Sequence, residues 1–101
     1  MDASNEVIHQ STRLRIMAAL HALPPRHLLG IVPLRRITGA TDGNLGSHLT
    51  TLEKAGYVKI AKDFVGRRPR TRVGITAPGR RAFEDHVRFL RAILDGDPDD
   101  A

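Results

Sequence analysis

Apolar residues recur with two different spacings along the chain, and the change of spacing divides it into helices and strands. Ile16, Leu20 and Leu23 are four and three residues apart, which predicts a first helix over residues 8–23 that ends at two prolines. The stretch HLLGI that follows is too short for a helix and predicts one brief strand. We therefore expect a helix and a short strand at the start of the fold.

Residues 33–56 have the pattern of two helices joined by a tight turn. Pro33 stands where a short second helix would begin, and Gly39 would close it. Thr41 is then a suitable N-cap for a third helix that runs to Gly56, with leucines every three or four residues on its core side. This arrangement predicts a helix-turn-helix.

Beyond the third helix the spacing falls to two, which is typical of strands. The stretches YVKIAK and TRVGIT alternate, and the glycine and proline of DFVGRRPR between them mark a turn. Residues 57–76 therefore predict an antiparallel hairpin with an arginine-rich tip. Residues 77–95 return to helical spacing and predict a long last helix capped by Thr76, followed by an acidic tail over residues 96–101.

The predicted order is helix, short strand, helix, helix, hairpin and long helix, within one domain of residues 1–101. A mostly helical α+β chain of this order matches a winged helix-turn-helix, in which the hairpin is the wing and the third helix is the recognition helix. A length of 101 residues with 41% hydrophobic content suits a single modest core.

Composition excludes several classes of function. The chain has no cysteine, which rules out disulfides and zinc–thiolate sites and suits a reducing cytoplasm. No apolar run approaches the ~20 residues that span a bilayer, and the first ten residues do not resemble a signal peptide, so we expect a cytoplasmic protein with no membrane partner. The five histidines lack metal-ligand spacing, and we expect no metal, no cofactor and no enzyme.

The net charge of +5 is unevenly distributed, because four of the eleven acidic residues lie near the C-terminal end. From Arg26 to Arg81 the chain has twelve basic and three acidic residues, a net charge of +9. A polyanion is the partner that this charge predicts. The alternative is a solvated basic surface that serves solubility.

The third helix carries Gly43 and Gly46 in its first two turns, although each interior glycine costs a helix about 1 kcal/mol relative to alanine. An outer face with few side chains lets backbone N–H groups approach phosphates, while Asn44 can pair with adenine. The alternative is that the glycines relieve crowding against the second helix. His48 flanks the leucine stripe, where we expect packing and hydrogen bonding rather than metal binding. The expected DNA contacts of the recognition helix are Thr41, Asp42, Gly43, Asn44, Ser47, His48, Thr51 and Lys54, and those of the second helix are Arg35 and Arg36.

The hairpin tip is the second candidate DNA contact. Arginines near a hairpin tip can reach phosphates or the negative potential of a narrow minor groove, and a proline stiffens the loop. The alternative is charge that protects an edge hairpin from aggregation. The expected wing contacts are Arg67, Arg68, Pro69, Arg70 and Arg72.

The last helix has two adjacent apolar rows, more than the body of so small a domain needs. The excess predicts a two-fold dimer formed with the N-terminal residues. The alternative is that the first helix of the same chain covers both rows. The expected dimer contacts are Val7, Ile8, Phe83, His86, Val87, Phe89, Leu90, Ile93 and Leu94.

Four stretches together resemble the small stand-alone winged helix regulators related to the MarR and ArsR families: STRLRIMAAL, TDGNLGSHLTTLEKAGYV, GRRPRTRVGIT and APGRR. The resemblance covers roughly Ile8 to Leu94. It implies a homodimeric transcription regulator, a repressor, with its third helix in the major groove of a pseudo-palindromic operator and its wing along the backbone or minor groove. MarR members bind small aromatic acids, and an effector is left open here.

Two alternatives to a sequence-specific regulator remain open. One is a winged helix module that binds RNA or an acidic protein partner through the hairpin charges. The other is an architectural DNA binder without sequence preference. Selection of bound duplexes from random DNA separates all three.

Overall fold

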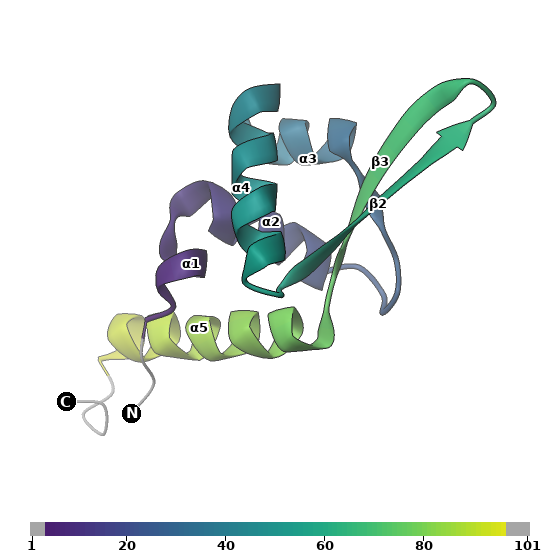
Figure 1. Ribbon diagram of the computed structural model, residues 1–101. Helices are drawn as coiled ribbons and strands as arrows, with labels where there is room; N and C mark the ends of the chain where they lie inside the picture. Colours follow the sequence, from purple (N-terminus) through teal and green to yellow (C-terminus); the bar gives the residue numbers. More distant parts are fainter. Residues whose placement is uncertain (1–3, 97–101) are drawn as a thin grey trace.

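The computed structural model describes residues 4–96, which form five helices and a three-stranded sheet (Figure 1). In chain order the elements are α1 (Glu6–His9), α2 (Ser11–His21), β1 (Leu29–Gly30), α3 (Ile31–Thr38), α4 (Asp42–Lys54), β2 (Val58–Val65), β3 (Arg68–Ile75) and α5 (Ala77–Asp95). This is the predicted winged helix-turn-helix, with α3 and α4 as the helix pair and β2–β3 as the wing. The predicted acidic tail lies outside the described residues beyond Gly96.

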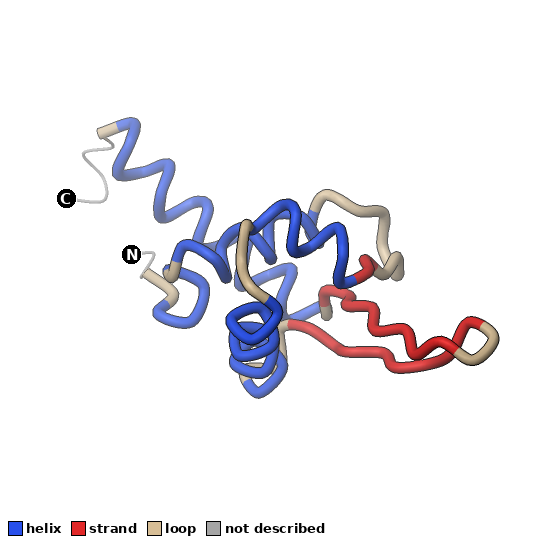
Figure 2. The backbone as a smooth tube through the Cα atoms, turned by 90° about the horizontal axis from the view of Figure 1, so that it is seen from above, coloured by secondary structure: helices blue, strands red, loops and turns tan. Residues whose placement is uncertain are grey.

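The sheet has the strand order β1–β3–β2, and its neighbouring strands are antiparallel. Strand β1 pairs with β3 only at two positions, among them Leu29 opposite Val73, which confirms the predicted brief strand. Strands β2 and β3 pair along their whole lengths, as far as Val65 opposite Arg68. Because β1 is so short, the outer part of the hairpin has no third strand and projects from the helical body (Figure 2).

The core lies where α1, α2, α3 and α4 meet the inner part of the sheet, and α5 adds Phe83 to it. The helices contribute the leucines and isoleucines that their spacing predicted, and each strand of the hairpin adds one valine. The buried core residues are Ile8, Ile16, Met17, Leu20, Leu34, Leu45, Leu49, Leu52, Val58, Val73 and Phe83.

Three helix boundaries follow from local side-chain and backbone chemistry. The hydroxyl oxygen of Thr41 accepts the N–H of Asn44 at 3.2 Å, which confirms the predicted N-cap of α4. The hydroxyl oxygen of Thr76 accepts the N–H of Gly79 at 2.9 Å at the start of α5, as predicted. Gly39 ends α3 with a φ of +69°, in the left-handed region that glycine enters without steric penalty.

The predicted first helix over residues 8–23 is wrong in its extent, because the chain breaks at Gln10 into α1 and α2. Gln10 is extended, and its side chain accepts the N–H of Arg13 at 2.9 Å, so it caps α2. Helix α1 is fixed separately through Asn5, whose side chain donates to the hydroxyl of Tyr57 at 3.0 Å. The break therefore combines a local cap on α2 with a contact of α1 to a residue 52 positions away from Asn5.

The second helix begins at Ile31, two residues earlier than predicted. Pro33 therefore stands inside its first turn instead of at its first position. A proline there removes no intrahelical hydrogen bond, since the first backbone N–H groups of a helix have no acceptor within it.

The stretch DFVGRRPR is not the loop that the sequence predicts. Its residues extend both strands of the hairpin and leave only Gly66 and Arg67 as the turn. Pro69 lies within β3 opposite Phe64, where β3 has no second neighbouring strand, and a proline is tolerated at such an edge.

Helix α5 runs beneath the other helices (Figure 1) and begins against the backbone of Tyr57, just before β2. Gly79 allows this approach, because a Cβ there would lie 2.0 Å from the carbonyl oxygen of Tyr57. The first half of α5 packs against α1 and α2, burying Phe83 and His86. The last turn is exposed, with Leu94 82% accessible.

Candidate nucleic-acid interface

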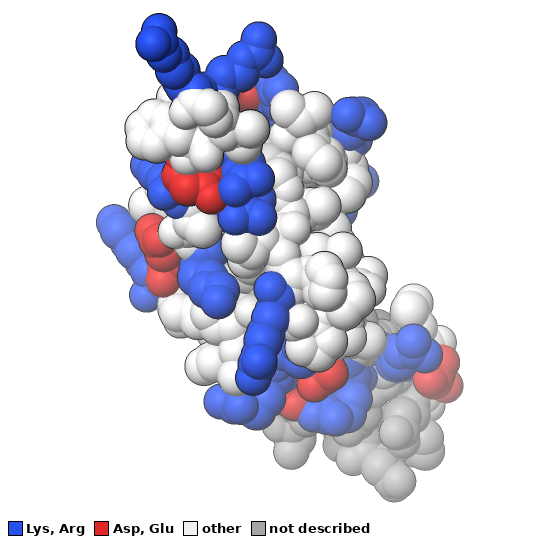
Figure 3. Space-filling model, turned by 90° about the vertical axis from the view of Figure 1, so that its right-hand side faces the viewer, with Lys and Arg blue, Asp and Glu red and all other residues white. Residues whose placement is uncertain are grey.

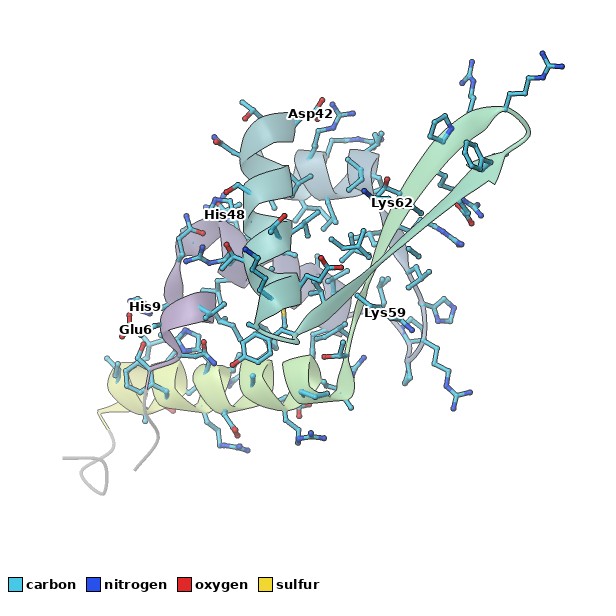
Figure 4. The ribbon with its side chains drawn as sticks, in the orientation of Figure 1. Glu6, His9, Asp42, His48, Lys59 and Lys62 are labelled. Atoms are coloured by element: carbon cyan, nitrogen blue, oxygen red, sulfur yellow. The ribbon has the colours of Figure 1, made fainter. Side chains whose placement is uncertain are left out.

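The first two turns of α4 form an open surface with little side chain. Gly43 and Gly46 are both exposed, and a Cβ added to either would have nothing within 4 Å. The alternative that these glycines relieve crowding against α3 is therefore wrong. Asp42 marks this end of α4 in Figure 4, and the wing tip projects beyond α3 at the same end of the molecule.

Two polar side chains stand on the exposed surface of α4. Asn44 and Ser47 are both exposed, and no hydrogen bond from their side chains to the rest of residues 4–96 is found. The hydroxyl of Thr51 is less free, since it donates to the carbonyl oxygen of Ser47 at 3.2 Å. Lys54 is exposed at the opposite end of the helix.

The acidic residue at the start of α4 is neutralised by α3. A guanidinium nitrogen of Arg35 lies 2.8 Å from a carboxylate oxygen of Asp42, and both side chains are well exposed. Arg36 is exposed in the last turn of α3. A phosphate near this end of α4 would therefore meet the positive helix end and a neutral pair, with little net repulsion.

His48 lies one turn beyond Asn44 on the side of α4 turned toward α2, where it is half-buried (Figure 4). Its Nδ1 atom is 3.5 Å from a guanidinium nitrogen of Arg13. Burial lowers the pKa of His48, and the charge of Arg13 lowers it further. A half-buried, neutral histidine positions α4, in agreement with the predicted packing role.

Arg13 is a positioning residue that the sequence did not reveal. Its Nε atom donates to the carbonyl oxygen of Val7 at 2.6 Å, while its terminal nitrogen reaches His48. Arg13 thereby joins α1, α2 and α4. No local pattern indicates this, because the partners are brought together only by the tertiary fold.

Two of the predicted tip arginines are held in the stem of the wing. Arg70 forms two hydrogen bonds to the carboxylate of Asp63, at 2.8 and 2.6 Å, and Arg72 donates a third at 3.2 Å. The hydrogen bond from Arg70 lowers the pKa of Asp63, and the charges of both arginines act in the same direction. The prediction that all four arginines lie at the tip is wrong, because the two-residue turn places only Arg67 and Arg68 there.

Further cations lie on β2 between the body and the tip. Lys59 and Lys62 are exposed, and both are labelled along the strand in Figure 4. Figure 3 shows lysine and arginine side chains distributed over the face from which the wing projects, with acidic atoms beside several of them. The lysines of the stretch YVKIAK were visible in the sequence as polar residues of a strand, but they were not among the predicted DNA contacts.

The residues predicted for a dimer separate into an inner and an outer group. Ile8 and His86 are 0% exposed and Phe83 is 9% exposed, so these three are buried within one chain and their assignment to a dimer surface is wrong. Helices α1 and α2 pack against the first half of α5, which is what the one-chain alternative expects for that half. Ile93 and Leu94 remain exposed. Of the other predicted contacts, Val7, Val87, Phe89 and Leu90 are half-buried.

His86 joins α5 to the N-terminal segment. Its Nδ1 atom accepts the backbone N–H of Asn5 at 3.2 Å, and its ring meets the edge of His9 with centroids 5.6 Å apart. Burial lowers the pKa of His86, and the charge of His9 adds to the effect. The neutral imidazole is therefore the form that fits this position.

Two further properties of residues 4–96 concern metals and membranes. Within this part of the chain, no three histidine, aspartate or glutamate side chains are grouped so that they could hold a metal ion. No helix in the same range is long and apolar enough to cross a membrane.

A helix-turn-helix followed by a basic hairpin defines the class as a winged helix protein. Residues 12–94 match the family model of the winged helix DNA-binding domain. This match covers most of the chain, and the protein belongs to that family. The relation to the MarR and ArsR families is compatible with the match and stays a prediction.

Individual relatives agree with this assignment. The chain is 32% identical over 82 residues to uncharacterized protein MJ0432 of Methanocaldococcus jannaschii, covering 81% of this chain and 86% of that one. A solved transcriptional regulator homologue from Pyrococcus horikoshii OT3 is 34% identical, with a TM-score of 0.79 over 91% of this chain and 88% of that chain. A candidate transcriptional regulator of Salmonella typhimurium, ytfH, shares the fold alone, with 19% identity and a TM-score of 0.71 over 93% of this chain and 80% of that chain.

Proposed function

We propose that the protein is a transcription regulator that binds duplex DNA sequence-specifically as a homodimer and acts as a repressor. The observation that carries the proposal is the open, side-chain-poor start of α4, at the same end of the molecule as Arg67 and Arg68. Neither glycine is needed to avoid a clash within the chain, so both leave room for a partner to approach the backbone of α4 closely. The similarity to a transcriptional regulator homologue from Pyrococcus horikoshii supports a role in transcription.

In this proposal α4 enters the major groove and the wing contacts the backbone beside it. Asn44 and Ser47 face the base edges, where an asparagine side chain can pair with adenine through two hydrogen bonds. The backbone N–H groups at the start of α4 meet a phosphate. Arg67 and Arg68 neutralise phosphates and set the position of the protein on the duplex.

The homodimer is supported by the outer half of α5. Ile93 is 62% exposed and Leu94 82% exposed on the last turns of a helix whose first half buries Phe83 and His86. A second copy that covers these side chains removes apolar surface from water and presents two copies of α4. The operator is then expected to be a pseudo-palindrome with half-sites about one helical turn apart.

Selection of bound duplexes from random DNA by the purified protein tests the proposal. We expect an enriched motif with inverted half-sites. Salt-sensitive binding to duplex without an enriched motif would instead identify an architectural binder. No binding to duplex, with retention of RNA or an acidic protein, would identify the hairpin charges as a site for that partner.

A further inference from the structure

The turn between α2 and β1 places an arginine in a backbone conformation that favours glycine. Arg26 has a φ of +70°, and within residues 4–96 it is the only residue other than glycine with a positive φ. The backbone N–H of His27 donates to the carbonyl oxygen of Pro24 at 3.1 Å, so Arg26 is the third residue of a four-residue turn. In a type II turn that position favours glycine or asparagine, because a larger side chain strains the left-handed backbone. The turn itself therefore gives no reason for an arginine.

The turn is held rigidly against the sheet. The two prolines before Arg26 restrict the backbone that leads into it. After the turn, Leu28 packs on the backbone of β3, where a Cβ at Gly74 would lie 2.6 Å from its methyl carbon. Leu29 then pairs with Val73 in the sheet. Arg26 is exposed on this fixed turn, so its side chain leaves the backbone from a defined position.

Two further basic side chains lie beside Arg26. The Cβ position of Gly74 is 3.4 Å from the Cε atom of Lys59 and 3.7 Å from the carbonyl oxygen of His27, so Lys59 reaches across β3 toward the turn (Figure 4). Both His27 and Lys59 are exposed. In the part of the chain from Ser4 to Gly96, no ion pair involves Arg26 or Lys59. We call Arg26, His27 and Lys59 the turn patch.

The turn patch lies away from the surface that we propose for DNA. The loop between α2 and β1 runs beside the start of α5, at the end of the molecule opposite the start of α4 (Figure 1). A duplex held by α4 and the wing would have to bend sharply around the wing to reach the patch. A few exposed ion pairs return little free energy against the cost of such a bend. A partner other than the bound duplex therefore fits the patch better.

We propose that the turn patch binds an acidic segment of a second protein while α4 and the wing hold DNA. Carboxylates are the protein groups that pair with arginine and lysine, and the guanidinium of Arg26 can donate to both oxygens of one carboxylate. Because the turn is already fixed, its backbone loses no freedom when the segment binds. This inference rests on the proposed function and gives the DNA-bound regulator a separate site for a protein partner.

A fluorescently labelled peptide of eight glutamates tests the turn patch on protein saturated with the selected duplex, so that α4 and the wing are occupied. Arg26→Gly is expected to weaken peptide binding by about fivefold and Lys59→Thr by about threefold, the order expected for exposed ion pairs. Arg26→Lys keeps the charge and should stay within about twofold of the parent protein. Arg91→Gln is the matched control, because it removes an exposed cation at the far end of α5 and should leave peptide binding unchanged.

The same substitution at the turn separates stability from binding. Arg26→Gly should raise the melting temperature by a few degrees, because glycine enters the left-handed region without strain. Arg26→Lys should leave the melting temperature unchanged. Affinity for the selected duplex should stay within about twofold in both variants, since the turn patch does not contact that duplex.

Four results would overturn the inference. Equal peptide binding by Arg26→Gly and the parent protein would show that the turn patch takes no acidic segment. Equal weakening by Arg26→Gly and Arg91→Gln would show only a general effect of positive charge. A lower melting temperature of Arg26→Gly would assign the arginine to the stability of the turn. If extending the selected duplex tightens binding by the parent protein but not by Arg26→Gly, the patch contacts flanking DNA instead.

Failure of the proposed function is distinguishable from failure of this inference. If the parent protein binds no duplex at all, the proposed function fails, and the peptide is titrated against the free protein. A loss of peptide binding in Arg26→Gly and Lys59→Thr that is absent in Arg91→Gln still supports the turn patch. Normal duplex binding with no such loss refutes this inference alone.

Discussion

Gly43 and Gly46 stand in a helix where alanine would fit without touching anything else in residues 4–96. Alanine at an exposed helical position is more favourable than glycine by about 1 kcal/mol. The packing of the fold therefore does not require these two glycines, and we propose that they serve a partner that approaches the helix. At the scale of single residues, Gly43 and Gly46 are the positions where stability favours alanine and the proposed function favours glycine.

Replacing Gly46 by alanine is expected to raise stability and to weaken DNA binding. The free energy of unfolding should increase by up to about 1 kcal/mol, which raises the melting temperature by several degrees. Affinity for the selected duplex should fall by about tenfold if the added methyl group keeps the backbone from reaching a phosphate. Thermal unfolding and a binding isotherm measure the two effects.

The exposed Ala18 of α2 provides the opposite control. Ala18→Gly should lower stability by a similar amount and leave affinity unchanged. A stabilised Gly46→Ala protein that binds DNA as tightly as its parent would show that the glycine serves no close approach.

In the proposed complex, Asp63 would compete with phosphates for two arginines of the wing. Its carboxylate accepts all three hydrogen bonds that Arg70 and Arg72 direct at it. Replacing Asp63 by asparagine removes the negative charge and releases both guanidinium groups. Affinity for every duplex should increase at low salt, and the slope of log affinity against log salt should steepen by up to about 2 per protomer.

The slope of log affinity against log salt for Asp63→Asn can also contradict this prediction. An unchanged slope would mean that Arg70 and Arg72 stay in the stem without their carboxylate partner or already contact phosphates in the parent complex. A melting curve for Asp63→Asn shows whether the stem still forms.

At the scale of elements, the contact between the N-terminal segment and α5 depends on a neutral histidine. The pKa of His86 is lowered from its ordinary value of 6.5 by burial and by His9. Because the unfolded chain then binds more protons than the folded chain, stability is fully present above about pH 6.5 and decreases as the pH falls below it. His48, with its pKa lowered by burial and Arg13, contributes in the same direction.

The melting temperature of the parent protein is therefore expected to be lower at pH 5 than at pH 7.5. In His86→Gln, which cannot titrate, the difference between the two pH values should shrink, although the variant is less stable at both. The exposed His27 gives the control, since His27→Gln should keep the full difference. Equal pH dependence in the parent and His86→Gln would exclude His86 as the sensitive group.

Elements with local signals were predictable from the sequence, and those fixed by distant contacts were not. Thr41 and Thr76 cap their helices through bonds to residues three positions on, so a short stretch suffices to predict them. The break at Gln10 was missed because glutamine is not among the preferred N-cap residues and because α1 is also held by Asn5 against Tyr57, far along the chain. Helical spacing alone cannot show whether one helix or two will form there.

The candidate site shows the same limit. The glycines and polar residues of α4 were found because helical periodicity places them on one face. The ion pairs of Arg70 and Arg72 with Asp63 were missed, because they depend on how the two strands of the hairpin pair. A two-residue turn sets Asp63 opposite Arg70, whereas the longer loop expected from the glycine and proline leaves that pairing undefined.

At the scale of the whole molecule, the proposed dimer is expected to form through the end of α5. Introducing Ile93→Glu together with Leu94→Glu should convert a sedimenting dimer into a monomer, since both side chains are exposed in the single chain. The fold should be retained, and affinity for a two-half-site duplex should fall because the half-sites are no longer bound by linked subunits.

Val32 is the matched control for the dimer, an apolar side chain 49% exposed on α3. Val32→Glu should leave the sedimenting mass unchanged. A dimer mass that persists in the double glutamate variant would place the interface elsewhere.

The central claim is that α4 reads sequence while the wing supplies charge, and the affinity of two variants across salt and sequence tests it most directly. For Arg68→Ala we expect similar weakening on every duplex and a slope of log affinity against log salt that is flatter by about 1 for each phosphate no longer neutralised. Arg70→Ala, whose guanidinium is held by Asp63, should change the slope less. For folded Asn44→Ala the slope should hold, while discrimination at one or two base pairs falls by roughly 1–3 kcal/mol. Full sequence preference in Asn44→Ala together with its loss in Arg68→Ala would contradict the claim and make the wing the reading element.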